Sequence, residues 1–148
     1  FDEAGNMLIQ KRTGTRSYSG KWDFTAGGGA QSGESSKDTV KREFKEETGL
    51  DYVIEVNEPI ASCRNKDWLV TYYAQVVNRK EFESSGSPHS DEVSEFKWVS
   101  IPEFEAMCSM GEFRDDVKRS LRIALGDIYE SLFRQQKAGM LSPTRNWG

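Results

Sequence analysis

Short runs in which apolar and polar residues alternate open the chain and predict β-strands. Met7–Arg12 follows the turn-like segment Asp2–Asn6, so we expect a hairpin turn and then a strand. Lys21–Ala26 places Trp22 and Phe24 two residues apart, which is the spacing of side chains on one face of a strand. The chain is therefore expected to begin with two strands.

The pattern becomes helical after three consecutive glycines, Gly27–Gly29. Ser35 or Ser36 can cap the start of a helix, and Gly49 can end it in the left-handed conformation. We therefore predict a helix from Ser35 to Thr48, although few of its residues are apolar.

Strands, a short helix and one long helix are expected in the rest of the chain. The pattern predicts strands at Tyr52–Cys63, Trp68–Val77 and Glu95–Ser100, a turn at Arg64–Asp67, a mobile loop at Glu83–Ser90 and a short helix at Ile101–Met107. Apolar residues recur at three- and four-residue steps over Phe113–Ala138, which predicts a long C-terminal helix of about 39 Å. We interpret residues 1–138 as a single α/β domain and Gly139–Gly148 as a tail.

Composition narrows the class of protein further. The chain has 148 residues and a mass of 16.8 kDa, which suits one domain, and it starts at Phe1, so we expect a segment to be missing before it. Its 20 basic and 24 acidic residues give a net charge of -4, which argues against nucleic-acid binding by bulk charge. The longest nearly apolar run is ten residues, whereas a membrane span needs about 20. Two distant cysteines, Cys63 and Cys108, favour a reducing, cytoplasmic location.

The predicted helix carries an unusual group of acidic residues. Glu43, Glu46 and Glu47 are spaced at i, i+3 and i+4, so their carboxylates share one side of the helix and repel one another. They also lie near the C-terminal end of the helix, where the dipole disfavours anions. A bound divalent cation such as Mg²⁺ or Mn²⁺ would reverse this penalty. The alternative is a solvated acidic surface, compensated by neighbouring Lys and Arg side chains.

The glycines and the helix together form a recognisable motif. Residues 28–50 follow the pattern G-x5-E-x7-R-E-U-x-E-E-x-G-U, where U is a bulky apolar residue. Gly28, Glu34, Arg42 and Glu43 fill the first fixed positions, and the remaining ones are Phe44, Glu46, Glu47, Gly49 and Leu50. A chance match is about one in 10⁸ per starting point. The chain therefore resembles the Nudix hydrolase family, on a motif that covers 23 of its residues.

The resemblance implies an α/β/α sandwich with a central mixed sheet, and a hydrolase of phosphoric anhydride bonds. Its substrate would be a nucleoside diphosphate linked to another group, and its cofactor Mg²⁺, with Mn²⁺ as a substitute. Glu43, Glu46 and Glu47 would be the metal-binding and catalytic carboxylates, and the Gly28 carbonyl a further metal contact. Glu34 and Arg42 would tie the loop to the helix.

Two further roles are assigned outside the helix. The general base lies on the helix in some members of the family and on a later loop in others, and here Glu92 is the favoured loop candidate. Arg12 and Arg16 precede the glycine loop, and with Gly28 and Gly29 they are expected to contact the substrate phosphates. The long C-terminal helix is expected to serve in packing or as a homodimer contact.

Two other functions stay open from the sequence. The segment from Leu8 to Gly28 also resembles the isopentenyl diphosphate isomerase branch of the same superfamily, which uses a cysteine after the tryptophan-containing strand. Thr25, Ala26 and Gly27 occupy that segment here, which disfavours the isomerase. A domain that senses nucleotides without turnover would be expected to lose motif carboxylates, and all of them are present.

Overall fold

The computed structural model describes residues 1–13, 19–56, 58–65, 68–89, 91, 93–114 and 130. The elements follow the order β1 (Met7–Arg12), β2 (Trp22–Phe24), α1 (Ser36–Thr48), β3 (Ala61–Asn65), β4 (Trp68–Tyr72), α2 (Arg79–Ser84), β5 (Val93–Val99) and α3 (Ile101–Ser109).

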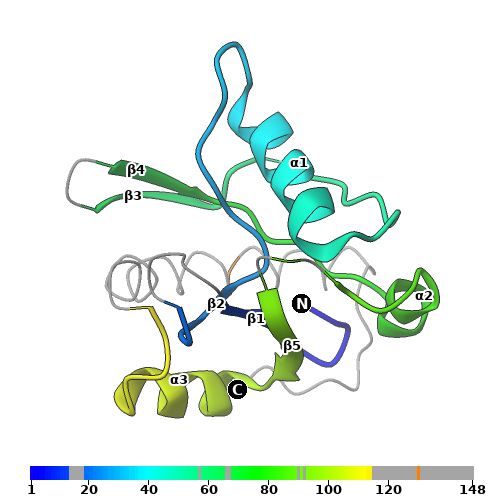
Figure 1. Ribbon diagram of the computed structural model, residues 1–148, viewed down its shortest axis with the longest axis vertical. Coiled ribbons are helices and arrows are strands. Elements are labelled where there is room, and N and C mark those ends of the chain that lie inside the picture. Colours follow the sequence, from blue (N-terminus) through cyan, green and yellow to red (C-terminus); the bar gives the residue numbers. More distant parts are fainter. Residues whose placement is uncertain are drawn as a thin grey trace.

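A three-stranded sheet with the order β2-β1-β5 forms the centre of the fold. Both of its strand pairs are antiparallel, and Gln10 of β1 lies opposite Asp23 of β2 and Phe96 of β5. Strands β3 and β4 form a separate antiparallel pair that extends to one side of α1 (Figure 1). Parallel pairing between described residues occurs at two isolated bridges, Asp2 with Val77 and Trp22 with Phe113, so the described three-stranded sheet is itself antiparallel.

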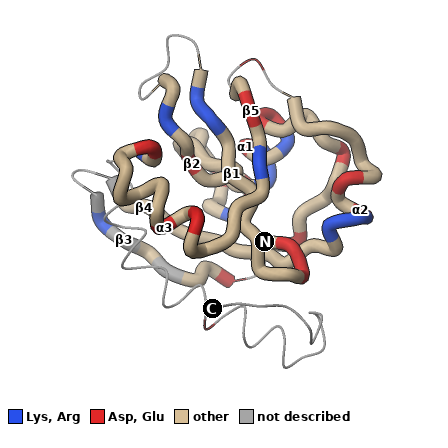
Figure 2. Tube along the Cα trace, turned by 90° about the horizontal axis from the view of Figure 1, so that it is seen from below, with Lys and Arg blue, Asp and Glu red and all other residues tan. Residues whose placement is uncertain are grey.

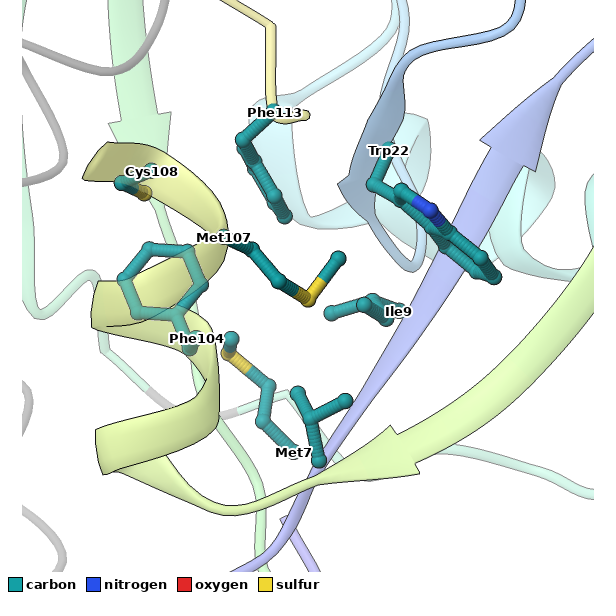
Figure 3. Close-up of a cluster of buried hydrophobic side chains, with 8 residues drawn as sticks. Met7, Ile9, Trp22, Phe104, Met107, Cys108 and Phe113 are labelled. Atoms are coloured by element: carbon teal, nitrogen blue, oxygen red, sulfur yellow. The ribbon is translucent and has the colours of Figure 1, made fainter. Parts of the chain in front are cut away.

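Alternation along β1 divides the hydrophobic core between the two faces of the sheet. Met7 and Ile9 pack with Trp22, Phe104 and Phe113 on the side that α3 covers (Figure 3). Leu8 points to the opposite side, toward the cluster that α1 and α2 build with Phe44, Leu50, Val77 and Phe82. Helix α1 thus lies over one face of the sheet and α3 over the other (Figure 1), which is the expected α/β/α arrangement.

Several predicted elements are confirmed by the structure. The strand Met7–Arg12 has the expected bounds, and α1 begins and ends within a residue of its prediction. The short strand, the last strand and the last described helix also occur at their expected places, as β2, β5 and α3. Helix α3 carries a capping box in which Ser100 and Glu103 satisfy each other's backbone N–H groups.

The middle of the chain differs from the prediction. Residues 52–56 and 73–76 are not strands, and β3 and β4 are correspondingly shorter than Tyr52–Cys63 and Trp68–Val77. The Glu55 N–H donates to the Gln75 side-chain Oε1 at 2.9 Å instead of to a neighbouring strand's backbone. Arg64 and Asn65, expected in a turn, belong to β3. The predicted loop at Glu83–Ser90 begins inside α2, which Asn78 caps and Phe82 anchors in the core.

The predicted C-terminal helix does not begin at Phe113, because this residue forms a β-bridge with Trp22 and is buried in the core. The rest of that helix, apart from residues 114 and 130, and the tail lie outside the described residues. In the part of the chain that the structure describes, no helix is long and apolar enough to cross a membrane.

Candidate functional site

Helix α1 is fixed at both ends by its own sequence. The Ser35 hydroxyl accepts a hydrogen bond from the Asp38 N–H at 3.2 Å, and Gly49 adopts the left-handed conformation with φ of 68°. Phe44 packs into the core next to Phe82, with ring centroids 6.2 Å apart. Because Glu47 and Thr48 lie near Phe44 on the helix surface, the face that Phe44 turns inward also carries an acidic side chain into the protein.

Glu47 is almost completely buried, with 2% of its surface exposed. One carboxylate oxygen, Oε1, accepts a hydrogen bond from the Gln10 side-chain Nε2 at 2.6 Å. The other, Oε2, accepts from the backbone N–H of Gly27 at 3.0 Å. The side chain therefore joins α1 to β1 and to the start of the glycine loop.

The environment of Glu47 favours its neutral form. Burial raises the pKa of its carboxyl to about 8, and the negative charges of Glu43 and Asp23 add to the rise, against the opposing effect of the two hydrogen bonds. A buried carboxyl with a perturbed pKa, next to other acids, is typical of catalytic and metal-binding sites.

Gly28 lies directly against the Glu43 carboxylate. A Cβ atom at Gly28 would be 2.8 Å from Glu43 Oε2 and closer still to Oε1 and Cδ. A Cβ at Gly27 or Gly29 would meet nothing within 4 Å. A side chain at position 28 would therefore force the Glu43 carboxylate to move from its place against the loop, whereas glycine lets the backbone and this carboxylate lie in close contact.

Arg42 joins the loop to the helix, as the motif implies. Its guanidinium donates to both oxygens of Glu34, at 2.8 and 3.1 Å, and to the Gly29 carbonyl at 3.1 Å. Its Nη1 also donates to Glu43 Oε1 at 3.0 Å and to Glu46 Oε2 at 3.1 Å. The hydrogen bonds from Arg42 lower the pKa of the Glu34 carboxyl to about 2.

The three helix carboxylates do not form a uniform acidic surface. The Glu43 side chain is 13% exposed and the Glu46 side chain 54%, whereas Glu47 is buried. Arg42 forms ion pairs with Glu43 and Glu46, so it offsets part of the repulsion between these two carboxylates, as expected for a solvated acidic surface with basic neighbours. Arg42 thus reduces the repulsion between Glu43 and Glu46. Glu47 contacts no cationic side chain through a described hydrogen bond, so its charge is not compensated in this way.

The arrangement has the donor chemistry of a divalent-cation site. In the described part of the chain, no three His, Cys, Asp or Glu side chains converge closely enough to hold a metal ion as they stand. Two low-exposure carboxylates, Glu43 and Glu47, nevertheless lie at the glycine loop, and the pKa of Glu47 is raised partly by Glu43. Carboxylate and backbone carbonyl oxygens are the hard ligands that Mg²⁺ prefers.

Basic residues gather at one end of the sheet, along β1 and beside β2 (Figure 2). Arg12 ends β1 and lies 3.6 Å from Asp23, which also accepts a hydrogen bond from Arg114 at 2.9 Å. The Asp23 charge acts on Glu47, so this end of the sheet belongs to the surroundings of the α1 carboxylates.

The remaining predicted site residues are only partly placed. Gly28 and Gly29 lie in the exposed loop before α1, and Arg12 is half-buried. Glu92 and Arg16 lie outside the described residues, so their assigned roles stay predictions. His89 lies close to the end of α1, where its backbone N–H donates to the Thr48 carbonyl at 2.8 Å.

Sequence reasoning missed Gln10 and Asp23, which belong to the surroundings of Glu47. Both follow an apolar residue in a strand, Ile9 and Trp22, and an alternating pattern gives such positions no distinguishing mark. Their role is visible only in the folded structure, because Gln10 and Glu47 are 37 residues apart in the chain.

Comparison with known proteins agrees with the motif and the fold. A family model described as the NUDIX domain matches residues 1–120. The chain is 30% identical over 119 residues to the uncharacterized Nudix hydrolase lmo0368 of Listeria monocytogenes, covering 76% of this chain and 66% of that protein. It is 31% identical over 109 residues to isopentenyl-diphosphate Delta-isomerase 2 of Photorhabdus laumondii, covering 72% of this chain and 62% of that protein.

A solved structure shows the same relationship in three dimensions. The crystal structure of the MutT protein from Methanosarcina mazei Go1 superposes with a TM-score of 0.57 at 25% identity, covering 92% of this chain and 88% of that one. The family match spans most of the chain, and its motif lies at the α1 carboxylates and the glycine loop. The chain therefore belongs to the Nudix family, whose MutT-like members are hydrolases of phosphoric anhydrides and generally use divalent metal cations.

Proposed function

We propose that the protein is a Mg²⁺-dependent hydrolase that cleaves the pyrophosphate bond of a nucleoside diphosphate linked to another group. The observation that supports this most is the pair of helix carboxylates at the glycine loop, with Glu47 buried and Glu43 against the Gly28 backbone. Burying acidic side chains beside one another costs stability, and a bound cation offsets that cost.

Glu43, Glu46 and Glu47 would hold the metal, with the Gly28 carbonyl as a further ligand. Mg²⁺ held by these groups would supply positive charge to neutralise a diphosphate and to activate a water molecule. Arg42 donates a hydrogen bond to one oxygen of Glu43 and one oxygen of Glu46. To bind the ion as well, each carboxylate would use its other oxygen or give up its bond to Arg42. Arg42 keeps its two bonds to Glu34 in either case, so the loop stays tied to the helix.

Arg12 and Arg16 are proposed to receive the substrate phosphates. Arg12 supports this role because it ends β1 beside Asp23, on the side of the sheet where Glu47 lies. A guanidinium offers two parallel N–H donors to a phosphate, so the binding of a diphosphate can orient it as well as neutralise it.

The general base is proposed to be Glu92, which directly precedes β5 in the sequence. E92Q preserves the size of the side chain and removes its ability to take a proton. We expect slower turnover with an unchanged KM for substrate. Activity within about twofold of the parent would instead assign the base to a carboxylate of α1, since general base catalysis is worth about 100-fold or more.

A phosphate-release screen tests the activity itself. Nucleoside triphosphates, ADP-ribose, dinucleoside polyphosphates and sugar nucleotides would each be incubated with the protein and Mg²⁺, with coupled phosphatase to reveal the new phosphomonoester. Hydrolysis of at least one of them, lost with EDTA and in E47Q, is the expected result. No hydrolysis of any of these compounds by folded protein with Mg²⁺ or Mn²⁺ would contradict the proposal.

An isomerase of isopentenyl diphosphate is the second candidate, because two relatives carry that name. The residues after β2 are Thr25, Ala26 and Gly27, where the resemblance requires a cysteine. Cys108 is a buried residue of α3, and Cys63 belongs to β3, so neither lies in that segment of the sequence. Incubation with isopentenyl diphosphate and Mg²⁺ decides between the two, since isomer formation without phosphate release would favour the isomerase.

A further inference from the structure

Gln10 occupies an unusual place for a polar side chain. It lies in the middle of β1, the central strand of the sheet, between Ile9 and Lys11, and only 1% of its surface is exposed. Burying an amide is unfavourable unless its polar atoms find partners, so a buried glutamine needs a specific reason to persist in a strand. An apolar residue would suit this position better on packing grounds alone.

The reason lies in its contact with Glu47. The Gln10 Nε2 donates to Glu47 Oε1 at 2.6 Å, which is shorter than the common N–H···O distance of about 2.9 Å. Gly27 donates its backbone N–H to the other oxygen at 3.0 Å. Each carboxylate oxygen thus has one donor from a different element, and the plane of the carboxylate is fixed by a strand on one side and a loop on the other.

The second polar atom of Gln10 argues against a purely stabilising role. Gln10 Oε1 is buried and has no hydrogen-bond partner within the ranges that the structure describes. A buried acceptor without a partner destabilises the folded state. The unpaired Oε1 of Gln10 therefore cancels part of the stability gained from the Nε2 hydrogen bond. Stability alone therefore does not account for an amide here, whereas control of the carboxylate does.

We infer that Gln10 is a positioning residue that holds the Glu47 carboxylate in the orientation needed to bind the divalent cation. This role rests on the proposed function, since it concerns the same metal site. Hydrogen bonds to metal-binding carboxylates typically change metal affinity or activity by about 10- to 100-fold when they are removed. Gln10 needs no contact with substrate for this purpose, because it acts through Glu47.

The variant Q10M tests the inference, because methionine has nearly the same length and volume but neither donates nor accepts strongly. Q75L is the control for the loss of a side-chain amide at another place, since Gln75 is half-buried and its Oε1 accepts from the Glu55 N–H. Mn²⁺ binding to the substrate-free protein would be followed by electron paramagnetic resonance, together with kcat, KM and thermal unfolding. We expect Q10M to bind Mn²⁺ about 10- to 100-fold more weakly and to have a lower kcat, with the KM for nucleotide within about twofold.

A double-mutant cycle separates positioning from general packing. In the E47Q background, Q10M should change Mn²⁺ affinity by less than about twofold, because the group through which it acts is already altered. Equal effects of Q10M in both backgrounds would overturn the inference, as would parent-like Mn²⁺ affinity in Q10M. If Q10M does not fold, Q10N replaces it, since asparagine keeps the amide but is one methylene too short to reach Glu47.

The outcomes also distinguish this role from the proposed function. A parent protein that binds Mn²⁺ but hydrolyses no anhydride would contradict the proposed reaction, while the Q10M effect on Mn²⁺ affinity would still support Gln10. A parent that hydrolyses its substrate and a Q10M variant that matches it in every constant would leave the function intact and remove Gln10 from the site. A parent that binds no divalent cation overturns both.

Discussion

Replacing Glu47 with glutamine removes the ionisable group from the most buried acidic position of α1 and nearly preserves its shape. The Glu47 carboxyl accepts one hydrogen bond from Gln10 and one from Gly27. In E47Q the new amide oxygen can accept from Gly27, and the new NH₂ group can donate to Gln10 Oε1, which has no partner in the described structure. A half-turn of the Gln10 amide is enough to make this exchange, so E47Q should fold normally.

The pKa of Glu47 sets how much the free energy of unfolding of the parent depends on pH. Burial raises the pKa of the Glu47 carboxyl from 4.5 to about 8 in the metal-free protein. Between these values the folded state keeps a proton that the unfolded state releases, so the free energy of unfolding falls as the pH rises. At about 1.4 kcal/mol per pKa unit, the loss between pH 4.5 and pH 8 is at most roughly 5 kcal/mol. That corresponds to at most roughly 15 °C in Tm for a domain of this size.

Thermal unfolding of the parent and E47Q in EDTA, at pH values from 5 to 9, measures this difference. We expect the Tm of E47Q to equal or exceed that of the parent, with a gap that widens toward high pH, while Mn²⁺ affinity drops and turnover falls by at least about 100-fold. E46Q is the matched control, because it makes the same charge change at a side chain that is 54% exposed. Parallel curves for the parent and E47Q over this pH range would refute the reasoning.

Two further predictions concern the loop and its arginine. G28A should weaken Mn²⁺ binding by about tenfold or more, because the new methyl group overlaps the Glu43 carboxylate, whereas G29A has open space and should stay within about twofold; equal affinities for the two variants would contradict this. R42K should lose the two-pronged bond to Glu34, so the Glu34 pKa rises toward its usual value. In the parent, this ion pair stabilises the fold above about pH 4.5, and the stabilisation is lost as the pH falls toward 2. Unfolding curves from pH 2 to 6 should therefore show a smaller decrease in stability at low pH for R42K than for the parent. If R42K loses as much stability at low pH as the parent, the two hydrogen bonds from Arg42 do not lower the Glu34 pKa.

Local signals explain why so much of α1 was predictable. A capping serine, a left-handed glycine and the i, i+3, i+4 spacing of acids are properties of a few neighbouring residues, and Ser35, Gly49 and the helix bounds follow them. The same holds for β1, where the strand bounds agree with the alternating pattern. The distribution of the acids between the buried and exposed sides of the helix depends on what α1 packs against.

Contacts between distant segments were the part that the sequence could not supply. The Gln10–Glu47 hydrogen bond and the approach of Gly28 to Glu43 depend on how the sheet, loop and helix are assembled. The predicted strands at Tyr52–Cys63 and Trp68–Val77 were longer than β3 and β4 for a related reason. Apolar residues such as Tyr52 were interpreted as strand positions, whereas Tyr52 packs against Phe82 of α2, with ring centroids 5.0 Å apart.

Crystals of the protein soaked in MnCl₂ would test directly whether the α1 carboxylates hold a cation. We predict a peak in the anomalous difference map between the glycine loop and α1, within about 2.5 Å of carboxylate oxygens of Glu43 or Glu47. Its height should fall in E47Q crystals treated in the same way. A map without such a peak, in a crystal where Arg42 still contacts Glu43 and Glu46, would contradict a metal-dependent hydrolase at this site.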